Sequence, residues 1–125
     1  MPIGETKALR ILIVEDEILV AMNLEDMLGE LGHNVVEIAT RITQASAMAA
    51  SSKIDLAILD LNLAGSLSFP VADILLQRGI PFMFATGYGS QGVTENYRDE
   101  FVLVKPYGLH ELQSAINKLM SISAV

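Results

Sequence analysis

Residues 9–17 read Leu-Arg-Ile-Leu-Ile-Val-Glu-Asp-Glu, an apolar run of strand length that ends in consecutive acidic residues. The run is rich in β-branched residues, and Arg10 is its only charge before Glu15. Successive side chains of a strand point to opposite faces, so a strand that is apolar throughout is buried on both sides. This stretch therefore predicts a strand of a parallel sheet that helices cover on both faces, with carboxylates at its carboxyl end.

The rest of the chain alternates between helical and strand-length patterns. Apolar or Ala-rich patterns predict helices over residues 20–31, 42–51, 71–78 and 109–119. Short apolar runs predict further strands over residues 35–39, 56–60, 81–85 and 101–104. This alternation predicts an α/β fold, a doubly wound parallel sheet of five strands in the order 2-1-3-4-5 along the chain. We expect a single domain over 1–125, with a core of about residues 8–120.

Composition excludes several classes of function. The formal net charge is −7, and Lys and Arg together number only 8, so we expect neither nucleic acid nor an anionic membrane as a direct partner. The chain has no Cys, which excludes disulfides, thiolate catalysis and Cys-ligated metal. No apolar run approaches the roughly 18 residues of a membrane span, and no export signal is evident, so a cytoplasmic location is expected.

Polar residues follow four of the predicted strands. Glu15 and Asp16 follow the first strand, Asp60 ends the third, Thr86 follows the fourth and Lys105 the fifth. In a doubly wound sheet the carboxyl ends of the strands meet at one edge, where such folds bind their ligands. Two carboxylates about 4 Å apart repel by roughly 4 kcal/mol at an effective dielectric of about 20, so the cluster requires a cation.

The residue types indicate a magnesium-dependent phosphoryl acceptor. Oxygen ligands without His or Cys suit Mg²⁺, and we expect Asp16 and Asp60 to bind it, with Glu15 directly or through water and the backbone carbonyl of Asn62 as a further ligand. Asp60, at a central strand end, is the expected nucleophile, because a carboxylate can attack phosphorus to form an acyl phosphate.

Two further strand-end residues complete the expected site. Lys105 is expected to pair with one phosphoryl oxygen, and the Thr86 hydroxyl to donate a hydrogen bond to another. Each residue alone also has an ordinary explanation, as a helix start, a turn residue or a solvated Lys before Pro. The site interpretation explains all of them together.

Glu15-Asp16, Asp60, Thr86 and Lys105-Pro106 resemble the pattern of response regulator receiver domains, over roughly residues 8–120. The resemblance implies a flavodoxin-like receiver fold and phosphorylation by a phosphohistidine of a sensor histidine kinase. Residues 81–89 are similar to a variant group marked by Pro-Phe-x-Phe-Ala-Thr-Gly-Tyr-Gly. That group implies a stand-alone receiver, often paired with an HWE-type kinase.

Two positions depart from the usual receiver pattern. Val102 stands where an aromatic switch residue is usual, and Leu63-Ala64-Gly65 stands where Met-Pro is usual. We hypothesise that Tyr88 replaces the missing aromatic and changes its packing on phosphorylation. The glycines of residues 87–99 predict a fourth helix that is short or mobile before phosphorylation.

Output is expected through protein contacts or by action as a phosphate sink, from a monomer or a phosphorylation-dependent dimer. The receiver family usually makes its contacts through the fourth helix, fifth strand and last helix, which here include Tyr97, Val102 and Tyr107. His33 and His110 are expected at the surface.

Two other classes of function compete with the receiver interpretation. A haloacid dehalogenase-type phosphatase needs a second Asp two residues after its nucleophile, where this chain has Asn62, and its nucleophile follows the first strand. A flavodoxin-like binding module needs a phosphate loop after the first strand, where Glu15, Asp16 and Glu17 would repel phosphate.

Overall fold

A computed structural model describes residues 7–87 and 102–123 of the chain. Its elements, in chain order, are β1 (Arg10–Val14), α1 (Ile18–Glu30), β2 (Asn34–Ala39), α2 (Ile42–Ser51), β3 (Leu56–Asp60), β4 (Asn62–Leu63), β5 (Ser66–Leu67), α3 (Phe69–Arg78), β6 (Phe82–Thr86), β7 (Val102–Val104) and α4 (Leu109–Ser123). Tyr88, Tyr97 and nearly all of the expected fourth helix lie outside the described residues.

The main sheet has five parallel strands in the order β2-β1-β3-β6-β7. This order is the predicted 2-1-3-4-5, because β4 and β5 form a separate small sheet between the third and fourth main strands. The chain passes from β1 to β2 on one side of it, and then crosses to β3, β6 and β7 on the other side. The winding direction therefore reverses between β1 and β3. The α/β fold predicted from the sequence is confirmed.

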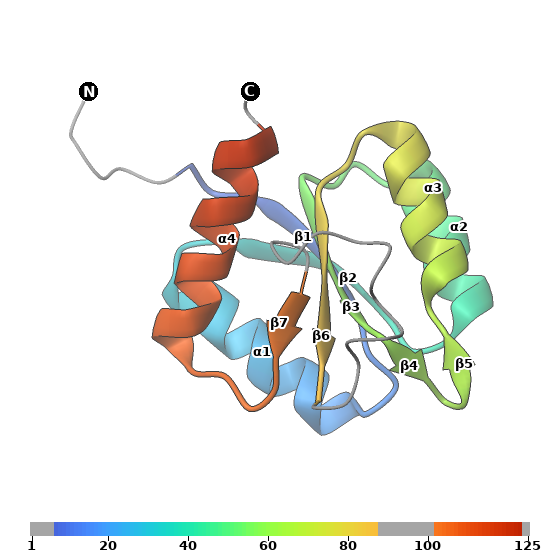
Figure 1. Cartoon of the computed structure of the whole chain (residues 1–125), viewed down its shortest axis with the longest axis horizontal. Helices are drawn as coiled ribbons and strands as arrows, with labels where there is room; N and C mark the ends of the chain where they lie inside the picture. The colour runs from blue at the N-terminus through green and yellow to red at the C-terminus, as the bar shows by residue number, and fades with distance from the viewer. Residues whose placement is uncertain (1–6, 88–101, 124–125) are drawn as a thin grey trace.

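Helices cover both faces of the sheet in three layers. Figure 1 shows α1 and α4 on one side of the strands and α2 and α3 on the other. Alternate residues of β1 supply the two cores: Leu12 and Val14 contact the cluster under α2 and α3, whereas Ile11 and Ile13 contact the cluster under α1 and α4. All four side chains are completely buried, as the apolar run predicted.

Two predicted helix ends coincide with left-handed glycines. Gly79 caps α3 with φ of 69°, and Gly32 follows α1 with φ of 89°. Residues without a Cβ adopt this conformation without steric cost. At its other end α3 begins at Phe69, earlier than the apolar spacing indicated, with Pro70 in its first turn, where the missing N–H has no helical partner to lose.

The hairpin formed by β4 and β5 was not expected from the sequence. Asn62 pairs with Leu67 and Leu63 with Ser66, so Ala64 and Gly65 form a two-residue turn. Both turn residues have positive φ, 51° for Ala64 and 90° for Gly65, as two-residue hairpin turns of this kind require. Ala rarely adopts such a conformation, which explains why its propensity gave no sign of the turn.

The surface position expected for His33 is wrong. His33 is only 6% exposed, and its Nδ1 accepts a hydrogen bond of 3.1 Å from the Leu9 N–H. Its polar sequence neighbours concealed this contact, because Leu9 lies 24 residues away along the chain. His110, in contrast, is exposed as expected.

This contact makes the stability of the fold depend on pH. Burial lowers the pKa of His33 below its ordinary value of 6.5. The unfolded chain therefore binds more protons than the folded chain just below pH 6.5, and stability falls as the pH decreases through that window. We expect urea unfolding of the wild type to show this loss between pH 7 and pH 5.

His33→Asn is the matched control, since its side-chain oxygen can accept the same hydrogen bond and does not titrate. As the pH falls, the free energy of unfolding of the wild type should decrease relative to that of His33→Asn. A difference that stays constant from pH 7 to pH 5 would contradict the assignment.

Candidate functional site

The strand register brings the carboxyl ends of four strands to one edge of the sheet. Val14 at the end of β1 is level with Leu59 of β3, and Asp60 is level with Ala85 of β6. Thr86 is in turn level with Val104, the residue before Lys105. The strand-end residues predicted as a site therefore share one edge.

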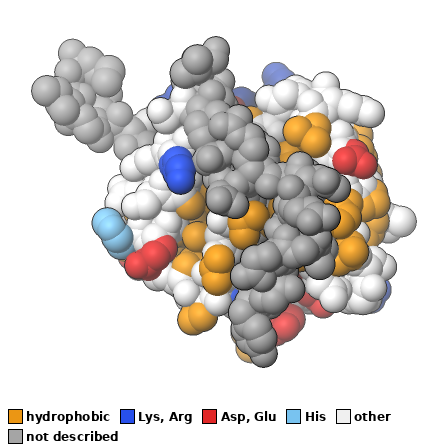
Figure 2. All heavy atoms as spheres, viewed as in Figure 1, with side chains coloured by type: hydrophobic (Ala, Val, Ile, Leu, Met, Phe, Trp, Pro, Cys, Tyr) orange, Lys and Arg blue, Asp and Glu red, His pale blue; other side chains and the backbone are white. Residues whose placement is uncertain are grey.

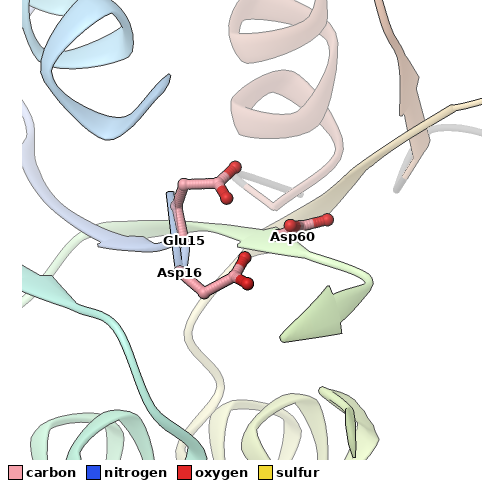
Figure 3. A group of neighbouring side chains, drawn as sticks. All are labelled: Glu15, Asp16 and Asp60. Atoms are coloured by element: carbon pink, nitrogen blue, oxygen red, sulfur yellow. The ribbon is translucent and has the colours of Figure 1, made fainter. Parts of the chain in front are cut away.

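Glu15, Asp16 and Asp60 form an acidic cluster at this edge. One carboxylate oxygen from each residue lies within 4.8 Å of the other two. Figure 3 shows the carboxylates of Glu15 and Asp16, after β1, directed to the same space as that of Asp60, at the end of β3. The structure thus brings together the three carboxylates that the sequence predicted as metal ligands.

Lys105 supplies a cation to this cluster. Its Nζ lies 3.3 Å from Oε1 of Glu15 and 3.6 Å from Oδ1 of Asp60. The Lys105 side chain is 30% exposed, whereas that of Glu15 is 6% exposed. The ammonium group therefore reaches from the surface toward Asp60, where it offsets part of the repulsion between the carboxylates.

The site holds more negative charge than one Lys can neutralise. Burial, together with repulsion from Asp60, raises the pKa of Glu15 to about 7, although the Glu17 N–H and Lys105 oppose the shift. The Glu17 N–H donates a hydrogen bond of 3.1 Å to Oε2 of Glu15, which fixes that carboxylate. An added cation at this point would favour the ionised form of Glu15.

The cluster has the donor set of a hard divalent ion. Its three residues offer only carboxylate oxygens, which suit Mg²⁺ or Ca²⁺ better than a transition metal. Few carboxylates, two of them partly exposed, fit Mg²⁺, which retains several waters. The backbone carbonyl of Asn62 as a further ligand stays a prediction.

Sequence reasoning missed one contact in the site. The Ala64 N–H, in the turn of the β4–β5 hairpin, donates a hydrogen bond of 3.2 Å to Oδ2 of Asp16. The departure from Met-Pro at residues 63–64 was visible in the sequence, and it is the signal that could have pointed to this amide.

Thr86 lies at the expected edge, but its hydroxyl faces a local partner. The residue is 8% exposed, and Oγ1 donates a long hydrogen bond of 3.4 Å to the Gly87 carbonyl. The Thr86 carbonyl accepts a hydrogen bond of 2.7 Å from the Lys105 N–H, which ties the ends of β6 and β7 together. The weak hydroxyl contact leaves Thr86 free to turn toward another acceptor, so its phosphate role stays a prediction.

A groove of about 220 Å³ adjoins the site between α1 and the segment after β7; it is lined by Val20, Asn23, Met27, Lys105, Pro106 and Tyr107. Burial, together with the charges of Glu15 and Asp60, raises the pKa of Tyr107 to about 12. The phenol therefore stays protonated beside the acidic cluster.

On the face drawn in Figure 2, the visible Lys and Arg side chains lie singly rather than in a patch. Within the part of the chain that the structure describes, every helix is too short or too polar to span a bilayer.

Comparison with known proteins agrees with this geometry. The sequence profile described as "Response regulator receiver domain" matches residues 11–117. The phyllosphere-induced regulator PhyR of Methylorubrum extorquens is 35% identical over 117 residues, which cover 90% of this chain and 44% of that protein. The chain spans about half the length of the curated relatives that it matches.

Solved structures give the same result. The solution structure of SdrG from Sphingomonas melonis Fr1 matches with a TM-score of 0.81 and 42% identity, covering 93% of this chain and 99% of that one. The crystal structure of the anti-anti-sigma factor PhyR from Bartonella quintana matches with a TM-score of 0.82 and 29% identity, covering 97% and 51%. With its family profile, its fold and its acidic strand-end site in agreement, the chain belongs to the response regulator receiver domain family.

Proposed function

We propose that this receiver accepts a phosphoryl group on Asp60 from a phosphohistidine of a sensor histidine kinase, in a Mg²⁺-dependent reaction. One observation carries the proposal: the Asp60 carboxylate lies within 4.8 Å of two further carboxylates and 3.6 Å from the Lys105 ammonium. A nucleophile beside candidate metal ligands and a cation is arranged for phosphoryl transfer.

The chain's own residues divide the work of the reaction. An Asp60 carboxylate oxygen attacks phosphorus, an acyl phosphate bond forms, and the nitrogen–phosphorus bond of the donor breaks with its electron pair left on the imidazole. Lys105 then exchanges its contact with Asp60 for one phosphoryl oxygen, and Thr86 donates to another. Bound Mg²⁺, held by Asp16, Asp60, Glu15 and the Asn62 carbonyl, would neutralise charge on the transferred oxygens.

Partners follow from the same proposal. The motif at residues 81–89 supports an HWE-type kinase as the donor. The relative described as an anti-anti-sigma factor supports output through contact with a protein rather than with nucleic acid. We expect the protein to act in the cytoplasm. In this proposal the receiver acts as a monomer, as a phosphorylation-dependent dimer or as a phosphate sink. The Tyr88 switch belongs to this proposal and lies outside the described residues.

The test is incubation of the wild type with acetyl phosphate, with Mg²⁺ or with excess EDTA, followed by intact-mass measurement. We expect one added phosphoryl group with Mg²⁺ and none with EDTA, because the carboxylates of the site repel an anionic donor unless a cation is bound. An unchanged mass in both samples would contradict the proposal. Rapid, repeated hydrolysis of a phosphate monoester such as p-nitrophenyl phosphate would instead favour the phosphatase alternative.

A further inference from the structure

The hydrogen bond between Ala64 and Asp16 joins two distant parts of the chain. The Ala64 N–H lies 3.2 Å from Oδ2 of Asp16, although the two residues are 48 positions apart. Asp16 follows β1, while Ala64 lies in the hairpin that begins two residues after Asp60. The bond therefore links a candidate metal ligand to the segment that carries the nucleophile.

This donor exists because the chain has Ala rather than Pro at position 64. Ala64 has φ of +51°, whereas a proline ring fixes φ near −65° and removes the N–H. The Met-Pro of the usual receiver pattern could supply neither the conformation nor the donor. The departure at this position thus adds a polar contact to the site.

The hairpin holds the donor in place. The Gly65 N–H donates a hydrogen bond of 2.9 Å to Oδ1 of Asn62, which closes the turn. Leu63 is 2% exposed and anchors the hairpin in the core under α2 and α3. The Ser68 N–H donates to the Leu61 carbonyl at 2.9 Å and closes the base of the loop. Ala64 therefore presents its N–H from a fixed backbone.

We propose that the Ala64 backbone amide is a positioning group for the metal ligand Asp16. The inference rests on the proposed function, in which Asp16 binds Mg²⁺. The amide engages Oδ2 and so sets the orientation of the Asp16 carboxylate, which would hold the ion. Hydrogen-bonded partners of metal ligands commonly account for about 10–100-fold in metal affinity, and this amide takes that place here.

Because the donor is a backbone group, the test replaces the amide itself. In the decisive variant, lactic acid replaces Ala64, so that an ester takes the place of the N–H and the methyl group stays. Ala64→Pro, a genetically encoded variant, also removes the N–H, although it excludes the positive φ of the turn as well. Ala64→Gly is the matched control, since it keeps the N–H and favours positive φ. Mg²⁺ affinity is measured for each by NMR titration, and the unfolding temperature is measured without Mg²⁺.

We expect the ester and Ala64→Pro to bind Mg²⁺ about 10–100-fold more weakly than the wild type, and Ala64→Gly to bind it equally well. If Ala64→Pro fails to fold, the ester variant decides. A purely structural role would lower the unfolding temperature of the ester and leave the Mg²⁺ affinity of its folded form unchanged, which would overturn this inference alone. Absence of Mg²⁺ binding in the wild type would overturn the proposed function as well.

Discussion

Asp60→Asn is expected to abolish phosphoryl uptake, from one phosphoryl group per chain in the wild type to none. The amide oxygen of Asn is neutral and a far weaker nucleophile than a carboxylate, so the attack on phosphorus does not proceed. The substitution is nearly isosteric, and it removes one of three mutually repelling charges from the cluster. Intact-mass measurement after incubation with acetyl phosphate and Mg²⁺ gives the result, and circular dichroism checks the fold.

Asp73→Asn is the matched control for this prediction. Asp73 lies on α3 with an exposed side chain, so the substitution makes the same chemical change away from the cluster. We expect the control to take up one phosphoryl group as the wild type does. Full phosphorylation of Asp60→Asn would show that Asp60 is not the acceptor, and equal loss in both variants would show that the effect is not specific to Asp60.

Phe84→Ala is expected to lower the free energy of unfolding by about 3–5 kcal/mol. Phe84 is completely buried in the interior strand β6. Its ring meets those of Phe69 and Phe82 edge-to-face, with centroids 5.7 Å and 5.6 Å away. Truncation loses apolar burial and both aromatic contacts, and it leaves a cavity that the surrounding strands cannot fill. Urea unfolding measures the loss.

Leu76→Ala serves as the control for this core prediction. Leu76 lies on α3 and is 51% exposed, so its truncation removes little buried surface. Surface substitutions of this kind usually change stability by less than about 0.5 kcal/mol. If Phe84→Ala were no more destabilising than Leu76→Ala, the core under α2 and α3 would be wrongly assigned.

Much of the site could be predicted from the chain alone. The uninterrupted apolar runs before Glu15 and Asp60 mark buried parallel strands, and parallel strands place their carboxyl ends at one edge. The residues at the strand ends could therefore be identified from the sequence, and Asp16, Asp60 and Lys105 could be placed together at this edge of the sheet. The contact of 3.6 Å between Lys105 and Asp60 agrees with that prediction.

The features that were missed depend on contacts between distant segments. The burial of His33 follows from its contact with Leu9, and the pKa of about 7 at Glu15 follows from its burial beside Asp60. Neither residue carries a local signal of its surroundings, because polar neighbours in sequence do not reveal what packs over a side chain.

The sequence by itself determined the order of the strands and the identity of the acidic edge, because hydrophobic periodicity and the right-handed crossover rule are local or topological constraints. Only the tertiary structure decided how the edge is completed. Ala64 takes a positive φ against its own preference, and its N–H reaches Asp16 across 48 residues. Such an arrangement is stabilised by the packing of the whole hairpin on the core, and local propensity does not encode it.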